Sequence, residues 1–584
     1  MPYIQVQDIR QGMDRKRDQR VVGELGTAWT IKNGHISRGG DVQRRKKFVK
    51  QNGSFPSTTS GLYTINETLY TTGYDAAEAA NVPSGVTHIL TQHPTPATAI
   101  ERTLDAKGFD GKLYSIIEFV DGNIYHYYDG TRVTDWDTLA ASIGSNNALA
   151  SSLANAIDKS PAVSATAAGP VITITSSFPG TAFTITQSTI NNGSNPDQTI
   201  TLVETVANAP MVAQVYTATI GGTFESADAF TITINGTEIY NITGGASGTG
   251  TSVLTFKKKL YSTASANLYF SALNAPTQWI SGVDYGFINM ASQIAGQETL
   301  TVAEEYQGLM VIFSQNNIRI WSVSEDSSAN VFIQTLQNTG TIAPRSVIPY
   351  GSNDVFYLAA SGIRSIKARD SSNAAYVSDV GTPIDTHIAE YLDTLTQEEA
   401  QNAIGMVEPV DGRFWMAIKN RIYTLSYFPS SKISGWSYYD VDFTIQNMTK
   451  RGNQIYVRGT DPDDGIDYLY IYGGLNNNTY PDKDEDICVI ELPYLSANDP
   501  AGNKSLIGFD IVGINSWKVE LLPDPNDDQV IVDLGIATGV TYGEPRFGVN
   551  SVTPLFALTL TCSEAGKATM SALAMHYNGT FETG

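Results

Sequence analysis

The chain has few cysteines and few histidines for its length. Its 584 residues include two cysteines, Cys488 and Cys562, without a Cys-x-x-Cys spacing. Neither a disulfide framework nor a structural zinc site is therefore expected. We interpret the two cysteines as inert thiols. Of the six histidines, only His88 and His93 lie close in sequence, in a loop rich in proline and threonine with no third ligand nearby. We expect no metal centre and no cofactor.

Long apolar runs and catalytic motifs are also missing. No stretch of 18 apolar residues occurs, and the opening MPYIQVQDIRQGMDRKRDQR lacks the apolar core of a signal peptide. We therefore expect a chain that is neither exported by a signal peptide nor membrane-spanning. The sequence contains no Gly-x-Ser-x-Gly, no His-Glu-x-x-His and no phosphate-binding loop. The expectation is a protein that is not an enzyme.

Charge is sparse and unevenly placed. Only 16% of the residues are charged and the net charge is −22. Residues 1–50 nevertheless hold 12 Lys and Arg against 5 Asp and Glu, a net +7, which leaves −29 for the remainder. Phosphate contacts need clustered Lys and Arg, so the acidic body argues against DNA binding by the whole molecule. Three interpretations of the basic segment stay open: a nucleic-acid-binding tail, an element that docks on an acidic partner, and a solvated terminus.

The composition is typical of a β-rich protein with many turns. Aromatic residues make up 10% of the chain, with 30 Tyr and 51 Gly. One pattern recurs, an apolar run, a polar turn and a second apolar run, which predicts hairpins. It occurs at 61–73, 267–279, 308–323, 353–368, 412–428 and 453–474.

The spacing of these hairpins indicates repeated units. From 267 onward they start 41, 45, 59 and 41 residues apart, which is typical of propeller blades that bury their faces only by stacking on neighbours. A β-sandwich array stays open as the alternative. The length exceeds what one core supports, so two to four domains are expected.

The segment between the first hairpin and residue 255 follows another pattern. It contains an expected strand pair at 111–128, a helix at 137–158 broken near Gly144, an alternating strand segment at 171–186 and a second β unit at 221–240. The predicted organisation follows. Residues 1–60 form a basic docking segment, 61–84 the first propeller hairpin, 85–255 an inserted β-rich domain with one helix, 256–475 the blades and 476–584 a closing blade or terminal β domain.

Two charged segments are candidate sites. The loop DPDDGID places Asp461, Asp463, Asp464 and Asp467 around a glycine turn but lacks the distal Glu and the flanking helices of an EF-hand, so a solvated hairpin loop is favoured over a calcium site. The segment 26–50 alternates apolar residues too regularly for a disordered tail. It predicts a strand pair with a basic polar face, which would dock through Arg38, Arg44, Arg45, Lys46 and Lys47.

The order of several motifs resembles one family. RGGDVQRR at 38–45, GLYTINETLYTTG, NLYFSALNAPTQW, GLMVIFSQNNIRIW and NTGTIAPRSVIPYG followed by VFYLAASGIRSI occur in the order found in the tail hub, or nozzle, of short-tailed phages. That family is also called tail tubular protein B or phage stabilisation protein. The resemblance covers residues 20–75 and 260–475 and leaves the insert outside.

This resemblance implies a six-bladed β-propeller core and a structural protein of the virion tail. The subunits would be made in the host cytoplasm and would form a homohexameric ring in the virion tail, below the head-to-tail adaptor and near fibre or spike proteins. Genomic DNA would pass through without sequence-specific binding, and an acidic lumen would repel phosphate and let the DNA slide. The alternative from another class is a propeller that binds or degrades host glycans.

Overall fold

The computed structural model describes residues 3–579, except 8, 17, 21–25, 96–97, 144, 159, 191–198, 223–228, 237, 244–249, 291–297, 372–378, 498, 528 and 541–546. The chain is mainly β, with 53% in strands and 9% in helices, as the composition predicted. It divides into two compact units. Unit 1 comprises Met1–Leu90, Glu304–Ile320 and Ile333–Gly584, and unit 2 comprises Thr91–Ala303 and Trp321–Phe332.

Unit 1 contains small sheets built from the predicted hairpins. Residues 61–73 form the hairpin of β8 (Thr59–Ile65) and β9 (Thr68–Gly73), which is joined by β10 (Val86–Leu90) in parallel. Residues 353–368 supply β31 (Asp354–Ala359) and β32 (Gly362–Ser365), next to β30 (Ile348–Tyr350). Both hairpin predictions are confirmed.

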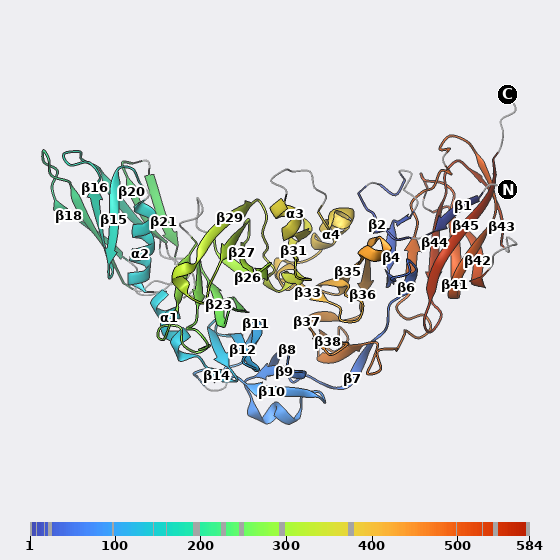
Figure 1. Cartoon of the computed structure of the whole chain (residues 1–584), viewed down its shortest axis with the longest axis horizontal. Coiled ribbons are helices and arrows are strands. Elements are labelled where there is room, and N and C mark those ends of the chain that lie inside the picture. Colours follow the sequence, from blue (N-terminus) through green and yellow to red (C-terminus); the bar gives the residue numbers. More distant parts are fainter. Residues whose placement is uncertain are drawn as a thin grey trace. The chain divides into compact units, whose positions relative to one another are not determined.

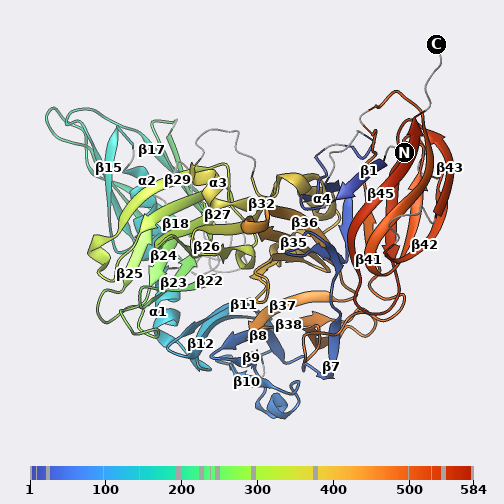
Figure 2. The same cartoon turned by 45° about the vertical axis from the view of Figure 1, so that its right-hand side comes forward.

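The last of these small sheets combines strands from opposite parts of the chain. The predicted hairpin at 453–474 is β38 (Gln454–Thr460) and β39 (Asp467–Tyr472), preceded by β37 (Thr444–Arg451). The N-terminal strand β7 (Phe48–Ser54) pairs antiparallel with β39, so Phe48 faces Tyr472. Figure 2 shows β7 beside β37 and β38. A strand more than 380 residues away in sequence therefore completes this sheet.

A larger sheet of sixteen strands among the described residues interleaves the two ends of the chain, and Figure 1 shows blue N-terminal strands beside red C-terminal ones. Its main path runs β33-β34-β35-β36-β4-β40-β44-β41-β45-β6-β5. The bounds are β1 (Tyr3–Gln7), β2 (Gly12–Met13), β3 (Thr27–Ala28), β4 (Thr30–Lys32), β5 (Gly34–Ile36), β6 (Val42–Arg44), β33 (Ile404–Val407), β34 (Phe414–Ile418), β35 (Arg421–Phe428), β36 (Ile433–Asp440), β40 (Cys488–Glu491), β41 (Lys504–Leu522), β42 (Val532–Val540), β43 (Phe547–Thr553), β44 (Ala557–Cys562) and β45 (Thr569–Gly579).

Two sequence expectations are settled within this sheet. The predicted hairpin at 412–428 is β34 and β35, and the predicted strand pair of the basic segment is β5 and β6. Strands β40–β45, which we call the C-terminal β domain, pair with β1, β4 and β6. One core of buried side chains, from Ile9 to Met575, underlies the whole sheet. The end of the chain is therefore built into the same core as its beginning.

Two separate cores lie within the described residues of unit 2. The first lies between the sheets β11–β14 and β22–β25 and includes Phe109, Tyr114, Trp136, Val253 and Trp279. These strands are β11 (Ile100–Phe109), β12 (Lys112–Phe119), β13 (Ile124–Tyr128), β14 (Thr131–Arg132), β22 (Ser252–Phe256), β23 (Lys259–Ala264), β24 (Asn267–Phe270) and β25 (Gly286–Asn289). The expected domain boundary at residue 255 falls inside this core.

The second core belongs to a module that we call the inserted module. Its buried residues all lie between Leu149 and Ile234. It consists of α2 (Asn146–Ile157), β15 (Val163–Ala168), β16 (Val171–Ser176), β17 (Ile185–Ile190), β18 (Thr199–Val206), β19 (Val215–Gly221), β20 (Ala229–Ile234) and β21 (Glu238–Thr243). Helix α1 (Thr134–Ile143) precedes it, so the expected broken helix is confirmed as two helices; Gly144 itself lies outside the described residues.

The remaining elements include one further sheet and short helices. Strands β26 (Leu300–Tyr306), β27 (Leu309–Ser314), β28 (Asn317–Ser322) and β29 (Val331–Gln337) form a sheet in sequence order, in which β27 and β28 are the predicted hairpin at 308–323. Residues 267–279 are different, because β24 is followed by a loop in which Ala272 bridges Ala275. That hairpin prediction was wrong: the second segment is a loop, in which Pro276 and Trp279 are buried while Thr277 and Gln278 are exposed. Helices α3 (Ile366–Ser371), α4 (Asp385–Leu392) and α5 (Gln397–Gln401) lie between β32 and β33.

Candidate functional site

The basic segment is the first candidate site, and the structure separates its five predicted residues. Strands β5 and β6 turn at Gly40, whose φ of +96° suits glycine. Arg44 and Arg45 are 0% and 1% exposed, although both had been expected on an outward polar face. The prediction of a uniformly basic face is therefore wrong for these two residues, because backbone carbonyls and a carboxylate of the same chain surround them.

Arg44 and Arg45 are anchored in the acidic, turn-rich stretch that follows residue 476. The Arg44 guanidinium donates to the carbonyl oxygens of Asp486, Glu485 and Glu564. Arg45 donates to the Asn33 side chain over 3.1 Å and to the Asp440 carbonyl over 3.0 Å, and it forms an ion pair with Asp486. Burial raises the pKa of the Asp486 carboxyl, and Arg45 beside it opposes this. These arginines hold two distant segments together.

The other three predicted residues lie nearer the surface. Lys46 donates to the Asn477 side chain over 2.8 Å, and burial lowers its pKa. Lys47 lies 3.0 Å from the Asp482 carboxylate and 2.5 Å from that of Glu485. Arg38 has a side chain that is 63% exposed, with Asp411 at 3.2 Å. The docking prediction therefore depends mainly on Arg38 and the two lysines.

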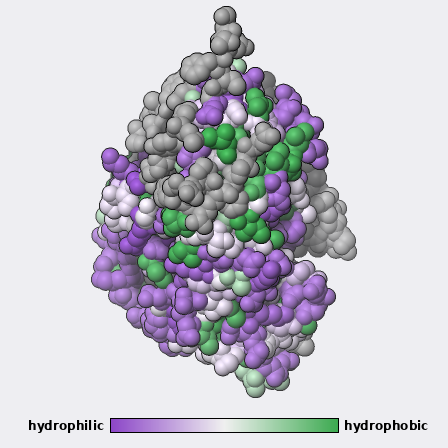
Figure 3. Space-filling view, turned by 90° about the vertical axis from the view of Figure 1, so that its right-hand side faces the viewer, coloured by the Kyte–Doolittle hydropathy of each residue, from purple (hydrophilic) through white to green (hydrophobic). Residues whose placement is uncertain are grey.

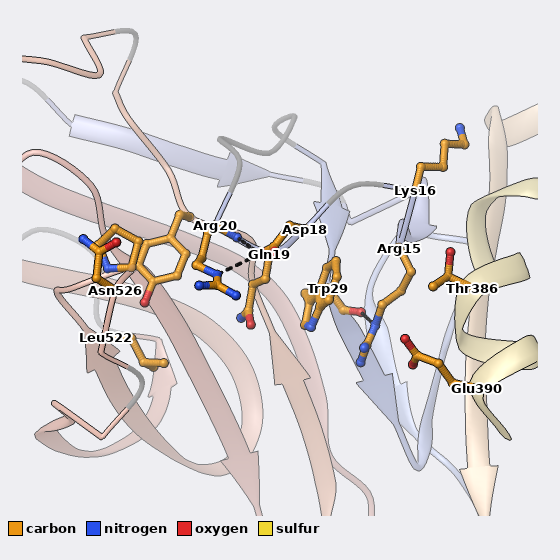
Figure 4. Close-up of a pocket in the computed structure, with 12 residues that line it drawn as sticks. Arg15, Lys16, Asp18, Gln19, Arg20, Trp29, Thr386, Glu390, Leu522 and Asn526 are labelled. Atoms are coloured by element: carbon orange, nitrogen blue, oxygen red, sulfur yellow. Dashed lines mark hydrogen bonds and ion pairs between the residues drawn. The ribbon is translucent and has the colours of Figure 1, made fainter. Parts of the chain in front are cut away.

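A polar cleft of about 570 Å³ is the second candidate site, and sequence reasoning did not single it out. It lies within unit 1, between the N-terminal segment, α4 and the C-terminal β domain (Figure 4). The lining residues are Arg15, Lys16, Asp18, Gln19, Arg20, Trp29, Thr386, Glu390, Tyr494, Leu522, Pro525 and Asn526. The excess of basic residues in the first 20 positions was the only signal in the sequence that could have indicated it.

Arg15 is fixed by three contacts on the α4 side of this cleft. Its Nε donates to the Trp29 carbonyl over 2.9 Å, its Nη2 donates to the Thr30 hydroxyl over 2.8 Å, and its guanidinium stacks 4.2 Å from the Trp29 ring centroid. Figure 4 shows Glu390 pointing from α4 toward Arg15. Burial lowers the pKa of Arg15, and Glu491 opposes this. The described lining of the cleft offers hydrogen-bond donors, the carboxylates of Asp18 and Glu390, and an aromatic face.

The carboxylates of the DPDDGID loop have protein partners. Asp461 accepts from Lys50 over 2.7 Å, Asp464 from the Tyr468 hydroxyl over 2.8 Å, and Asp467 from Arg458 over 2.6 Å. The loop joins β38 to β39, as a hairpin loop should. Within the described ranges no three acidic, histidine or cysteine residues are grouped as metal ligands would be.

His88 and His93, the two histidines that are close in sequence, have separate local surroundings, and neither belongs to a group of three possible metal ligands among the described residues. The His93 Nε2 lies 3.0 Å from the Asp121 carboxylate, and its ring packs edge-on against Phe119 and Tyr125. His88 belongs to β10, and burial lowers its pKa. Each ring therefore serves its own local packing.

The third candidate site is an apolar surface on the C-terminal β domain. Figure 3, which faces this domain, shows apolar side chains in several groups among polar ones. Seven valine and isoleucine side chains on β41–β43 and the turn before β42 are 37–61% exposed; they are Ile514, Val530, Ile531, Val532, Ile536, Val540 and Val552. Among the described residues β42 pairs with β41 alone. We call this set the apolar surface.

The sequence could not identify the apolar surface. The run VIVDLGIATGV reads as a strand, and in the structure Leu534 and Ala537 point into the core while Ile536 and Val540 point outward. Both faces of β42 are thus apolar, and only the fold decides which one is covered. An apolar outer face on an open edge strand is a surface that proteins normally cover.

Comparisons with known proteins add little to this picture. No protein-family model and no curated protein matches the chain. Two solved structures with weak similarity are the Pan2 WD40 domain of Neurospora crassa (8% identity, TM-score 0.24, 52% of this chain and 85% of that one) and the allergen Mala s 1 of Malassezia sympodialis (9% identity, TM-score 0.24, 44% and 90%). At these TM-scores neither similarity carries an argument. None of the helices in the described part of the chain has the length and apolar character needed to cross a membrane.

Proposed function

We propose that the chain is a structural subunit of a closed homohexameric ring, the tail hub or nozzle of a short-tailed phage, through which DNA is retained and ejected. The proposal starts from the order of motifs in the sequence. The apolar surface of the C-terminal β domain is the observation that supports it, because in a six-fold ring each subunit presents two different surfaces that complement each other, and this surface would be one of the two.

The size of the apolar surface fits one side of a subunit contact. Seven branched side chains are each more than a third exposed, and together they expose roughly several hundred Å² of apolar surface, in several groups. A standard protein interface covers about 800 Å² per partner. We therefore propose that a second copy of this chain covers the apolar surface, and that polar residues around it complete the contact.

The finer fold proposal is a propeller. The described residues outside the inserted module form six small sheets, and strands β33–β36 of the large sheet make a seventh group of this kind. The resemblance implies six blades. The pairing of β7 with β39 supports a propeller, since a distant terminal strand that completes the last sheet is one way to close a ring of blades.

The experiment is a mass and symmetry measurement. The purified chain, alone and mixed with its adaptor, is expected to give a six-fold ring in electron micrographs and a hexamer mass by native mass spectrometry. A chain that stays monomeric in both samples would overturn the proposed function.

The assigned contact is tested separately. The double variant Ile536→Lys with Val540→Lys should lose the ring, because it buries two charges in the contact. The matched control is Val203→Lys with Val206→Lys, at residues that are also exposed on β18 of the inserted module, and it should assemble normally. If the wild type and the double variant both form rings, the apolar surface is not the contact, although the ring stands.

A further inference from the structure

The two cysteines of the chain lie directly opposite each other. Cys488 begins β40, Cys562 ends β44, and the antiparallel register pairs Cys488 with Cys562 and Val489 with Thr561. Opposed residues of antiparallel strands have side chains on the same face and Cα atoms about 4.5–5.5 Å apart. A disulfide spans Cα distances of about 4.4–6.8 Å. The backbone therefore already has the spacing that a disulfide needs.

This pair sits at a junction of the large sheet. Strand β40 pairs with β4 on one side and with β44 on the other. It thereby links β36 and β4 to the strands of the C-terminal β domain. Both cysteines are fully buried as free thiols in the core beneath this sheet. A bond between them would fasten the C-terminal β domain to the rest of the sheet.

We propose that Cys488 and Cys562 are a redox-active pair that closes to a disulfide when a disulfide oxidant such as oxidised glutathione is present. The Cys562 thiol loses its proton and the thiolate attacks one sulfur of oxidised glutathione, which releases one glutathione thiolate. The Cys488 thiolate then attacks the Cys562 sulfur of the mixed disulfide and releases the second glutathione thiolate. The two protons end on the two glutathione thiols, so two protein thiols are oxidised and one oxidant is reduced.

Burial controls how fast this pair reacts. It raises the pKa of both thiols, while the nearby Arg44 guanidinium opposes the rise at each. The thiolate is the reactive form, so closure in the folded chain is slow and local opening of the strands speeds it. In a virion, as proposed above, the chain would be made reduced in the cytoplasm and would close the bond after release into an oxidising medium.

The test counts thiols in the purified full-length chain, before and after incubation with oxidised glutathione. Each sample is alkylated with iodoacetamide in denaturant and weighed by mass spectrometry. The reduced chain should take up two alkyl groups, and the oxidised chain should take up none and retain no glutathione. A second sample is refolded from urea in glutathione buffer, so that the oxidant reaches both thiols before they are buried. It should give the same result.

Two variants and a stability measurement complete the test. Cys488→Val and Cys562→Val fill the space of the lost thiol, and each should keep one thiol, free or bound to glutathione. Closure of a loop of more than 70 residues should raise the thermal midpoint of the wild type by roughly 5–10 °C and leave both variants unchanged. The proposal is overturned if the wild type keeps two thiols in both samples, if glutathione stays bound, or if the bond forms without a rise in the midpoint.

Discussion

The guanidinium group of Arg45 forms a buried ion pair with the carboxylate of Asp486, 441 residues further along the chain. The two belong to segments that stand out in the sequence for opposite charge, the basic run at 44–47 and the acidic stretch after residue 476. The first and last parts of unit 1 are therefore joined by charge as well as by strand pairing.

Asp486→Asn should lower the free energy of unfolding of unit 1 by about 3 kcal/mol, because it leaves the Arg45 charge buried without its counter-ion. Asparagine tolerates the positive φ of 42° at this position, so the backbone is not the cause. Urea denaturation measures the effect. Lys518→Ala, which breaks an ion pair with Glu520 around a half-exposed lysine, is the control and should change stability by less than about 0.5 kcal/mol.

Gly12→Ala should destabilise the large sheet by at least about 2 kcal/mol. Gly12 has a φ of +68°, and an added Cβ would lie 2.6 Å from the Gly435 Cα, against the backbone of β36. Gly412→Ala is the matched control, since its φ is +73° and no atom lies within 4 Å of the added Cβ. The control carries backbone strain alone, so equal losses in the two variants would disprove the close-approach argument.

Stability should fall with acid partly through His387. Burial lowers the pKa of this α4 histidine to about 4, and Arg15 and Arg421 add to the effect. The unfolded chain binds a proton near pH 6.5 while the folded chain does not, so this contribution is complete above pH 6.5 and is lost progressively as the pH falls toward 4. The loss reaches about 3 kcal/mol.

His387→Gln isolates this contribution, because glutamine stays polar and does not titrate in this range. Thermal or urea midpoints of both proteins between pH 7 and pH 4 give the comparison. The variant should show the shallower decline. Parallel pH profiles would mean that the folded His387 titrates normally.

The inserted module should fold alone. Its core draws only on residues between Leu149 and Ile234, so a fragment of residues 145–250 is expected to melt cooperatively. Replacing 146–249 by a short Gly/Ser linker should leave the remaining core of unit 2 intact, whereas deleting 85–255 removes Phe109, Tyr114, Trp136 and Val253 from it and should unfold it. Circular dichroism and limited proteolysis distinguish the two deletions.

Under the proposed function, docking on the adaptor should depend on Arg38. Arg38→Ser removes an exposed charge and should leave folding stability within about 0.5 kcal/mol. It should weaken adaptor binding several-fold at low salt, with a smaller difference at high salt. Arg44→Met should instead lower stability, because the guanidinium has three carbonyl partners inside the fold. Unchanged adaptor binding by Arg38→Ser at every salt concentration would argue against docking through this segment.

Local patterns in the sequence determined much of the secondary structure. Five of the six hairpins, the broken helix and the strand pair at Gly34–Arg44 follow from apolar alternation and from turn residues such as Gly40, because these signals act over a few neighbouring residues. The mainly β class follows in the same way. The loop at 267–279 shows the limit, since an apolar run can serve a core without being a strand.

Only the tertiary structure decided which residues meet across hundreds of positions. It placed Arg44 and Arg45 inside, set Cys488 against Cys562, completed the β37–β39 sheet with β7, and left Ile536 rather than Ala537 facing outward. Each of these outcomes depends on strand register and on which face of a sheet is covered. A shift of one residue in register reverses every side chain of a strand, and no local pattern fixes that choice when both faces of the strand are apolar.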